Sequence, residues 1–489
     1  MRAVRSVRGP AVLVAAGSAA LGVAGALYPV LFAAVLGAAA MAIAAAAAYA
    51  RPGVALRVAF LGVLLAQTKF RFRDPSATLS GDVDGQVIFE LGLYAAIGVA
   101  SLAALLGAGR LGRLTRAEWI VLAYVGIAAT SVLWSYAPLL TAVRGLELAI
   151  LLVLALASMR VLGAVGTVDA AASAILLFVL LFATIALLVP AASGSHVSWT
   201  GFSRFAWFAV HPIECATYAS LATIFVLCES AWGDRALPRR RLGVPSWLYA
   251  GPLLGIVFLT RSRGPALALV AALMALGARR AVGRRWTPVL VVLTALVGTL
   301  ALLAPLLDVP SLFAATPDGS LLSRVATSGN PVATFFFRGQ SAEEIESFSG
   351  RAELWRGLTV LFLDRPVLGY GYQGARALVL GVMPWAAYAH NAYVETLLDV
   401  GMLGSVPLLL AAVRGLASGS LQAPTAGDVS ASSRAALFAV TVFLLVNSVT
   451  AESFAAAPGF ETLALFVCAV SAGRLRADTG TGRSVAGGW

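Results

Sequence analysis

The sequence predicts an all-α polytopic membrane protein with about 12–14 transmembrane helices and one long extracytoplasmic loop that carries short helices. Three observations predict this fold class. The 489-residue chain is 60% hydrophobic, and only 12% of its residues are charged, about half the fraction of a soluble protein. Its mean hydropathy is +0.89. Apolar runs of roughly 17–25 residues recur from end to end, and each can cross a hydrocarbon core about 30 Å thick.

The apolar runs divide the chain into about fourteen expected spans. The basic N-terminus MRAVRSVRGP resembles the start of a signal peptide, but further spans follow at once, so we interpret it as the cytoplasmic start of a first span. Several spans are short, and the first three could merge or shift. The expected spans are 11–27, 29–50, 54–68, 87–108, 117–136, 139–159, 167–190, 206–228, 247–260, 265–278, 287–305, 392–413, 434–452 and 457–473.

Arginine-rich connections orient these spans. Because positively charged loops stay on the cytoplasmic side, four such segments should lie there, and strict alternation of the spans agrees. The basic segment KFRFRDPS (69–76) falls outside and departs from the rule. The four segments are RLGRLTR (110–116), DRALPRRR (234–241), ARRAVGRR (278–285) and RLRADTGTGR (474–483).

The same orientation divides the chain into four parts. Residues 350–363 within the large loop have Leu354, Leu358 and Phe362 at helical spacing, which predicts an amphipathic helix on the membrane surface, with Arg351 on its polar side. The four parts are a helical transmembrane region with short loops (1–305), a large extracytoplasmic loop (306–389), C-terminal transmembrane helices (390–473) and a cytoplasmic tail (474–489).

Several functional classes are disfavoured. The three cysteines form no CxxC pair, so we expect neither a disulfide framework nor a metal site. Membrane orientation explains the net charge of +12, and no nucleic-acid-binding motif accompanies it.

The segment GYGYQG (369–374) fits GxGxxG formally but lacks a βαβ context, and we interpret it as a flexible turn. The segment GDVDG (81–85) is weak evidence for a metal-dependent sugar transferase, and overall we expect no metal and no cofactor.

Three cationic residues precede spans that should begin at the outer face. Arg204, Arg263 and His390 come just before the spans that begin at 206, 265 and 392. A helix N-terminus carries partial positive charge, and guanidinium groups bind phosphate in a bidentate manner. The pattern predicts a pocket for a phosphorylated ligand, with Arg261 close to Arg263. The alternative is that each arginine reaches toward lipid headgroups.

Other polar residues lie deeper in the expected spans. Arg144, Glu395 and Asp399 either contact the ligand or form structural ion pairs with one another. His211, beside Pro212, predicts a helix kink or a ligand contact. His390 has Asn391 and Tyr393 beside it, and its imidazole could accept a proton from a hydroxyl group at neutral pH.

Four segments together carry a family resemblance. They are SVLWSYAPLLTAVRGLE (131–147), SRFAWFAVHPIECA (203–216), FLTRSRGPALALV (258–270) and, within 349–404, SGRAELWRG, DRPVLGYGYQG and AHNAYVETLLDVGMLG. The chain resembles the bacterial O-antigen ligase and O-antigen polymerase superfamily. One departure is that HPIE at 211–214 replaces the more usual HPN, which weakens the case for His211.

The resemblance implies transfer of a glycan from undecaprenyl pyrophosphate, without a metal, on the outer side of the bacterial cytoplasmic membrane. It implies that Arg204 and Arg263 are the essential arginines and His390 the loop histidine. We expect these arginines, with Arg261, to bind the pyrophosphate while His390 orients or deprotonates the acceptor, with Glu395 orienting His390 or holding the acceptor. Further substrate-binding residues are expected at Arg144, Asn391, Tyr393, His211 and Arg351.

The expected partners are the lipid-linked donor, a glycolipid, glycan or protein acceptor, and membrane lipids, but no nucleic acid. The acceptor decides between ligase, polymerase and protein glycosyltransferase, and the sequence does not choose. Two alternatives differ in class. One is a small-anion transporter, which predicts sites near the midplane and inverted repeats that we do not find. The other is a non-catalytic component of a polysaccharide assembly system.

Overall fold

The computed structural model describes the helical framework of the chain. The expected spans 11–27 and 287–305, the segment 69–76 and the loop from 306 to 350 lie outside the described residues. The described residues are 45–68, 85–109, 112–188, 195–197, 203–206, 210–232, 240–241, 244–282, 351–386, 388–418, 430–455 and 457–480.

The all-α polytopic fold class is confirmed. Within the described ranges, six helices are long and apolar enough to cross a membrane, namely α5 (Gly85–Gly107), α6 with η1 (Arg116–Leu133), α7 (Pro138–Val161), α8 (Gly163–Leu188), α9 (Pro212–Trp232) and α19 (Ala392–Ser418). Shorter apolar helices accompany them in α3 (Pro52–Ala66), η3 with α10 (Ser246–Leu259), α11 (Arg263–Val282), α20 (Ser430–Asn447) and α21 (Phe460–Gly480).

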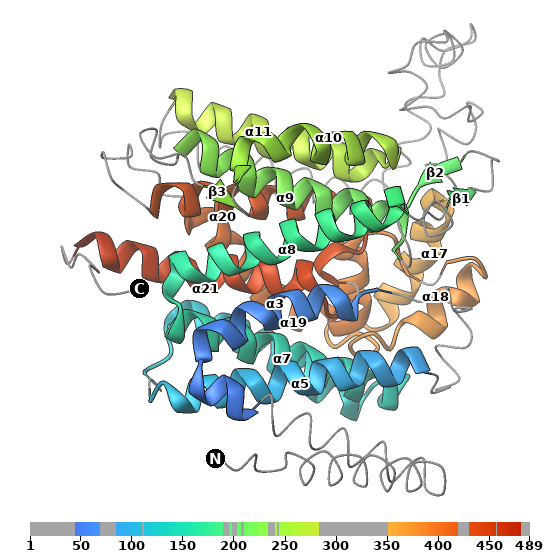
Figure 1. Cartoon of the computed structure of the whole chain (residues 1–489). Helices are drawn as coiled ribbons and strands as arrows, with labels where there is room; N and C mark the ends of the chain where they lie inside the picture. Colours follow the sequence, from blue (N-terminus) through green and yellow to red (C-terminus); the bar gives the residue numbers. More distant parts are fainter. Residues whose placement is uncertain are drawn as a thin grey trace, which may run out of the picture.

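The long helices run roughly side by side, so their ends gather at two opposite ends of the bundle (Figure 1). One end carries α17 (Arg351–Asp364), α18 (Arg376–Val382) and the hairpin of β1 (Ser195–Val197) with β2 (Ser203–Phe205). We name this the site end. The opposite end carries β3 (Arg240–Arg241), paired with β4 (Val244–Pro245), and the C-terminal part of α21. We name it the arginine-rich end.

Ion pairs fasten the arginine-rich end. The buried carboxylate of Glu118, at the start of α6, pairs with Arg160 from α7 at 2.5 Å and with Arg474 from α21 at 2.8 Å. Glu118 also closes a capping box with Thr115. On the other side of the bundle, Arg241 from β3 pairs with Glu229 at the end of α9 and with Asp169 near the start of α8. These arginines are therefore neutralised by acids of the helix ends.

The core consists of small and aromatic side chains. α19 packs against α21 and α6, and α20 packs against α11 and α9. α20 is buried almost throughout, with Phe438 and Phe443 fully enclosed between alanines. Helices in a membrane gain stability from close van der Waals packing, and small residues permit that approach. Large apolar side chains such as Leu254 and Met274 face outward from α10 and α11.

The segment 369–374 is not the flexible turn that the sequence predicted. The N–H of Tyr370 donates to the carbonyl of Leu398 at 2.7 Å, and the N–H of Tyr372 donates to Ser131 Oγ at 2.8 Å. Tyr372 and Gln373 are fully buried. The segment is thus held between α19 and η1, because irregular backbone at membrane depth must be enclosed by protein.

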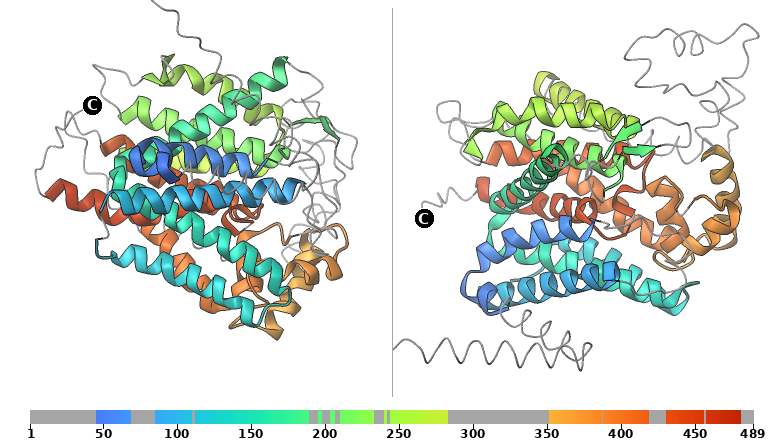
Figure 2. Two further views of the ribbon diagram at one scale, coloured as in Figure 1. Left: turned by 60° about the horizontal axis from the view of Figure 1, so that its bottom comes forward. Right: turned by 45° about the vertical axis from the view of Figure 1, so that its right-hand side comes forward.

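The predicted amphipathic helix is present as α17, but its apolar face does not meet lipid. Leu354 and Leu358 are fully buried in a cluster with Val379 of α18 and Leu398 of α19. Figure 2 shows the segment of α17 and α18, in light orange, at one end of the bundle. Arg351, expected on an exposed polar side, instead donates from Nη1 to the carbonyl of Thr450 at 3.0 Å. α17 therefore closes the site end of the bundle.

We predict that Gly401→Ala destabilises the protein. Gly401 interrupts α19 at φ 60° and ψ −167°, a conformation adopted almost only by glycine that costs other residues about 1–3 kcal/mol, and a Cβ there would collide with the carbonyl of Val367. The Tm of the detergent-purified variant should fall clearly. Gly92→Ala on α5, where a Cβ meets nothing within 4 Å, is the matched control. Equal Tm values for the two variants would contradict this account of the kink.

Candidate functional site

Three arginines and one histidine from separate segments meet at the site end. Arg204 lies in β2, Arg263 begins α11, Arg351 begins α17, and His390 comes just before α19. The turn at the end of α20, residues 447–453, borders all of them except Arg204, and we call it the central turn. The sequence prediction that Arg204, Arg263 and His390 lie near one another is consistent with this geometry, although their roles remain predictions.

Arg204 does not stand at a helix entrance, contrary to the sequence prediction, because α9 begins only at Pro212. Its guanidinium is buried and bridges to the connection between α10 and α11. Nε donates to the carbonyl of Thr260 at 3.1 Å, and Nη2 donates to Ser262 Oγ at 2.7 Å. Burial, and then the neighbouring guanidinium groups of Arg263 and Arg351, lower the pKa of Arg204 to about 10. Arg204 thus stays charged at neutral pH, inside a cluster of like charges.

Arg263 stands at the start of α11, where the sequence placed it. The preceding Arg261 adopts φ 50°, a left-handed conformation that few non-glycine residues take, and thereby turns the chain into the helix. Next to Arg263, Gly264 packs against Thr450 so closely that a Cβ would collide with its hydroxyl. The start of α11 and the central turn are therefore in direct contact.

Arg351 joins the same cluster through its bond to Thr450. Burial lowers the pKa of Arg351, and the carboxylate of Glu452 opposes that effect. Its influence on the pKa of Arg204 places its charge near that of Arg204. The mutual repulsion of desolvated arginines costs free energy, and a bound anion would reduce that cost.

His390 lies at the entrance of α19, as predicted. The residue adopts φ 51°, and its ring stacks on Trp385 with centroids 5.8 Å apart. Nδ1 lies 2.6 Å from Oε1 of Glu452. The imidazole keeps 28% of its side-chain surface exposed, so it is accessible to a ligand.

Asn391 and Tyr393 support the fold at this entrance. The side-chain oxygen of Asn391 caps α19 by accepting from the N–H groups of Tyr393 at 2.9 Å and Val394 at 3.2 Å. Its amide donates to the carbonyl of Val449 at 3.2 Å, and the Tyr393 hydroxyl donates to the carbonyl of Leu445 at 2.7 Å. Their polar groups fasten α19 to α20 and to the central turn, which favours positioning roles over direct ligand binding.

Glu452 was missed by the sequence analysis. Burial alone would raise the pKa of its carboxyl, but His390 and, more weakly, Arg351 outweigh that effect and hold the pKa at about 2. The only signal in the sequence was an acidic residue at the end of the expected span 434–452, in the segment TAESF. Charged residues in so short a connection are common, so the segment by itself did not indicate a site.

Glu395 does not contact His390 in the way the sequence analysis expected. Its Oε2 accepts from the N–H of Ala389 at 2.7 Å, which shapes the backbone just before His390. Asp399 is held by Gln373 Nε2 and by the N–H of Ala375, each at 3.4 Å. The contact to His390 comes from Glu452 instead.

Arg144 is paired elsewhere in the bundle. It bonds to Glu90 of α5 at 2.5 Å and to Glu147 of its own helix at 2.7 Å. The proposed pairing of Arg144 with Glu395 or Asp399 was therefore wrong, because the two acids of α19 are held by the backbone and side chains of the 373–375 and 389 region. Arg144 as a substrate-binding residue remains a prediction.

His211 does not lie inside a helix, and Pro212 does not kink one. Pro212 is the first residue of α9, a position where a missing N–H costs nothing. The Nδ1 atom of His211 accepts from the N–H of Ile213 at 3.3 Å and so helps to cap the helix. This contact explains His211 as part of the start of α9, and its role toward a ligand remains a prediction.

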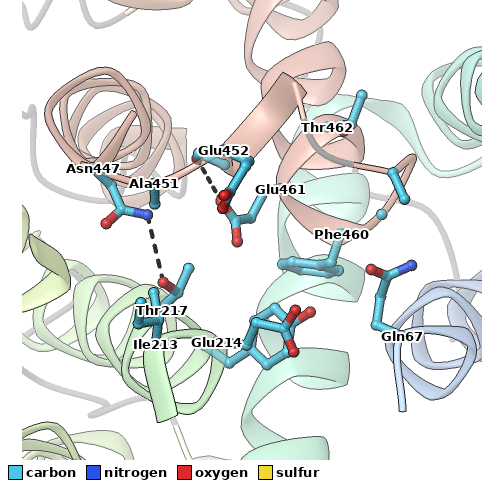
Figure 3. A pocket seen from close by; sticks show the side chains of 14 residues that line it. Gln67, Ile213, Glu214, Thr217, Asn447, Ala451, Glu452, Phe460, Glu461 and Thr462 are labelled. Atoms are coloured by element: carbon cyan, nitrogen blue, oxygen red, sulfur yellow. Dashed lines mark hydrogen bonds between the residues drawn. The ribbon is translucent and has the colours of Figure 1, made fainter. Parts of the chain in front are cut away.

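A polar cavity of about 60 Å³ lies beside the central turn (Figure 3). Three glutamates line it from three elements: Glu214 of α9, Glu452 of the central turn and Glu461 of α21. Asn447 and Thr217 close one side through a bond of 3.5 Å. Such a space holds only a few water molecules. Within the described ranges, no cluster of three or more histidine, cysteine, aspartate or glutamate side chains is arranged to hold a metal ion.

Fold and site together define a multi-pass membrane protein with a cationic cluster and an accessible histidine at one end of its helical bundle. The model of the O-antigen ligase family matches residues 248–409 of the chain. That range includes Arg263, Arg351 and His390, whereas Arg204 and Glu452 lie outside it. This match supports the resemblance of the chain to the O-antigen ligase superfamily. None of the curated proteins compared with the chain matches it.

We predict that inorganic pyrophosphate binds this cluster and raises the Tm of the purified protein in proportion to the logarithm of its concentration above Kd. The shift should shrink at high ionic strength and largely disappear in Arg263→Ala and Arg351→Ala. Arg365→Ala is the control, because Arg365 lies at the site end with 49% of its side chain exposed. A shift of equal size in all three variants would mean that the anion binds elsewhere.

Proposed function

We propose that the protein transfers a glycan from undecaprenyl pyrophosphate to an acceptor hydroxyl on the outer side of the bacterial cytoplasmic membrane. The O-antigen ligase domain supports a ligase-like or polymerase-like function in polysaccharide biosynthesis. Donor, acceptor and mechanism go beyond that domain match and form the proposal. The reaction class is glycosyl transfer from a lipid-linked donor, with inversion at the anomeric carbon.

One observation carries the proposal. The guanidinium groups of the buried Arg204 and the half-buried Arg263 and Arg351 influence one another electrostatically. The accessible imidazole of His390 lies beside the central turn, which also binds Arg351. A diphosphate would neutralise the mutual repulsion of the arginines, since its charge matches a cluster of cations. A hydroxyl acceptor would find a base nearby. These are the two requirements of transfer from a sugar diphosphate.

The chemical step follows from these positions. The acceptor oxygen attacks C1 of the donor sugar and forms the new C1–O bond, while the bond from C1 to the phosphate oxygen breaks. Arg204 and Arg263, with Arg351, stabilise the negative charge that develops on the leaving undecaprenyl pyrophosphate. The proton of the acceptor hydroxyl passes to Nε2 of His390. Attack from the face opposite the leaving group inverts the configuration.

The acceptor stays open between a glycolipid, a growing glycan and a protein. A transport function is less well supported, because the charged residues that would line a path have structural partners. Arg144 is paired with Glu90 and Glu147, and Asp399 is bound by Gln373 and the backbone. No specific contact favours a purely scaffolding role.

The test is glycan transfer by purified protein from lipid-linked donor to a panel of acceptors. We predict that Arg263→Ala lowers the rate about 10²–10³-fold and that His390→Ala lowers it about 10²–10⁴-fold. Arg263→Lys should recover only part of the loss, because an ammonium group cannot bind in a bidentate manner. Arg365→Ala should transfer at the wild-type rate. Wild-type rates in folded Arg263→Ala and His390→Ala proteins would exclude the assigned residues.

We further predict that the arginine-rich end faces the cytoplasm and the site end faces outward. A membrane-impermeant maleimide added to spheroplasts should label Arg365→Cys and should label Arg113→Cys only after permeabilisation. The native cysteines Cys215, Cys228 and Cys468 are buried and should remain unlabelled. The reverse pattern of labelling would place the site on the cytoplasmic side.

A further inference from the structure

We propose that Glu452 is the positioning residue of His390 and selects the tautomer that leaves Nε2 free to act as the base. The effect of Glu452 on the reaction rate rests on the proposed glycosyl transfer. The pairing of Glu452 with His390 can be measured without that reaction. Neither the family match, which ends at residue 409, nor the sequence motifs point to Glu452.

The pairing has a defined geometry. Oε1 of Glu452 lies 2.6 Å from Nδ1 of His390, which leaves Nε2 as the other ring nitrogen. The stacking of the ring on Trp385, with an angle of 13° between the planes, restricts rotation of the imidazole. A carboxylate that accepts a hydrogen bond from Nδ1–H fixes both the tautomer and the orientation of the ring.

The backbone around the pair is clamped on both sides. The N–H of Ala392 donates to the carbonyls of Ser448 at 2.9 Å and Ala451 at 3.0 Å. The side chain of Asn391 donates to the carbonyl of Val449 at 3.2 Å. The segment that carries His390 and the turn that carries Glu452 therefore cannot move independently, which keeps the carboxylate and the imidazole in contact.

The charges around Glu452 keep it ionised. Arg351 from α17 and His390 favour its charged form, whereas Glu395 of α19 and Glu461 of α21 interact with it unfavourably. Glu214 of α9 lines the same cavity (Figure 3). Glu461 is hydrogen-bonded by Ser453, so its carboxylate has a partner of its own. Glu452 is the carboxylate that contacts His390.

The pair gives the transfer step a consistent proton balance. Nε2 accepts the acceptor proton, Nδ1 keeps its own proton, and Glu452 stays unprotonated and faces the imidazolium that forms. Its negative charge stabilises that imidazolium at the moment when the acceptor oxygen loses its proton. Removing the charge should therefore slow the reaction and also change its dependence on pH.

The first test is ¹⁵N NMR of protein labelled at histidine, which is feasible because the chain has three histidines. His390→Gln assigns the His390 signals. In the wild type, the neutral imidazole should carry its proton on Nδ1. In Glu452→Gln, the amide can donate as well as accept, so the population of this tautomer should fall. A wild-type His390 with its proton on Nε2, or a spectrum that Glu452→Gln leaves unchanged, would overturn the inference whatever the transfer assay gives.

The second test is the pH profile of glycan transfer. Glu452→Gln should lower kcat about 10²-fold and move the acid limb of the profile to lower pH by about one unit, because a lost negative charge disfavours the imidazolium. Glu452→Asp should restore part of the rate and return the acid limb of the pH profile to its wild-type position. Such a recovery would also show that the site folds. Glu353→Gln on the exposed face of α17 is the control.

The outcomes of these tests separate the two proposals. If His390→Ala and Arg263→Ala abolish transfer while Glu452→Gln keeps the wild-type rate and pH profile, the inference about Glu452 fails and the proposed function stands. If the wild type transfers no glycan to any acceptor while NMR shows the Nδ1–H tautomer and its dependence on Glu452, the pairing stands and the proposed function fails.

Discussion

The site depends on one short turn. Residues 447–453 follow α20 and present carbonyl groups in several directions: Thr450 accepts from Arg351, Val449 from Asn391, and Ser448 and Ala451 from the N–H of Ala392. Glu452 at its end contacts His390. Backbone groups at the end of a helix lack intrahelical partners, so they are available to hold other segments. α17 and α19 are thereby fastened to the end of the most enclosed helix in the described part of the bundle.

This arrangement stores electrostatic free energy. Arg204 is buried among two other guanidinium groups, and two neutral oxygen acceptors, from Thr260 and Ser262, hold it in place. At the opposite end of the bundle, Arg160, Arg241 and Arg474 all have carboxylates as partners. The two ends therefore differ in electrostatics, because the arginines of the arginine-rich end are paired with carboxylates while those around Arg204 repel one another.

The sequence predicted the helices better than the connections. Span limits for α5, α7, α10 and α19 agree closely with the structure because long apolar runs in a bilayer have one stable solution. The predictions failed where contacts between individual residues determine the structure. The start of α9 depends on Pro212, the rigidity of the 369–374 segment depends on Ser131 and Leu398, and the partner of His390 comes from a turn far along the chain. Hydrophobic periodicity and charge counts contain no information about such pairings. The pairing of Glu452 with His390 is therefore apparent only in the three-dimensional structure.

The short helices beside the site have a consequence for the surrounding lipid. The η3–α10 helix of 14 residues is about 21 Å long, less than the roughly 30 Å of a bilayer core, and exposed apolar side chains such as Phe258 lie on it. Lipid adjusts to such a mismatch by thinning around the protein. Headgroups beside α10 would then sit deeper than elsewhere, near the connection that leads from α10 to Arg263. A prenyl carrier that diffuses in the membrane plane would have its phosphates lowered toward the cation cluster before any contact with the protein forms.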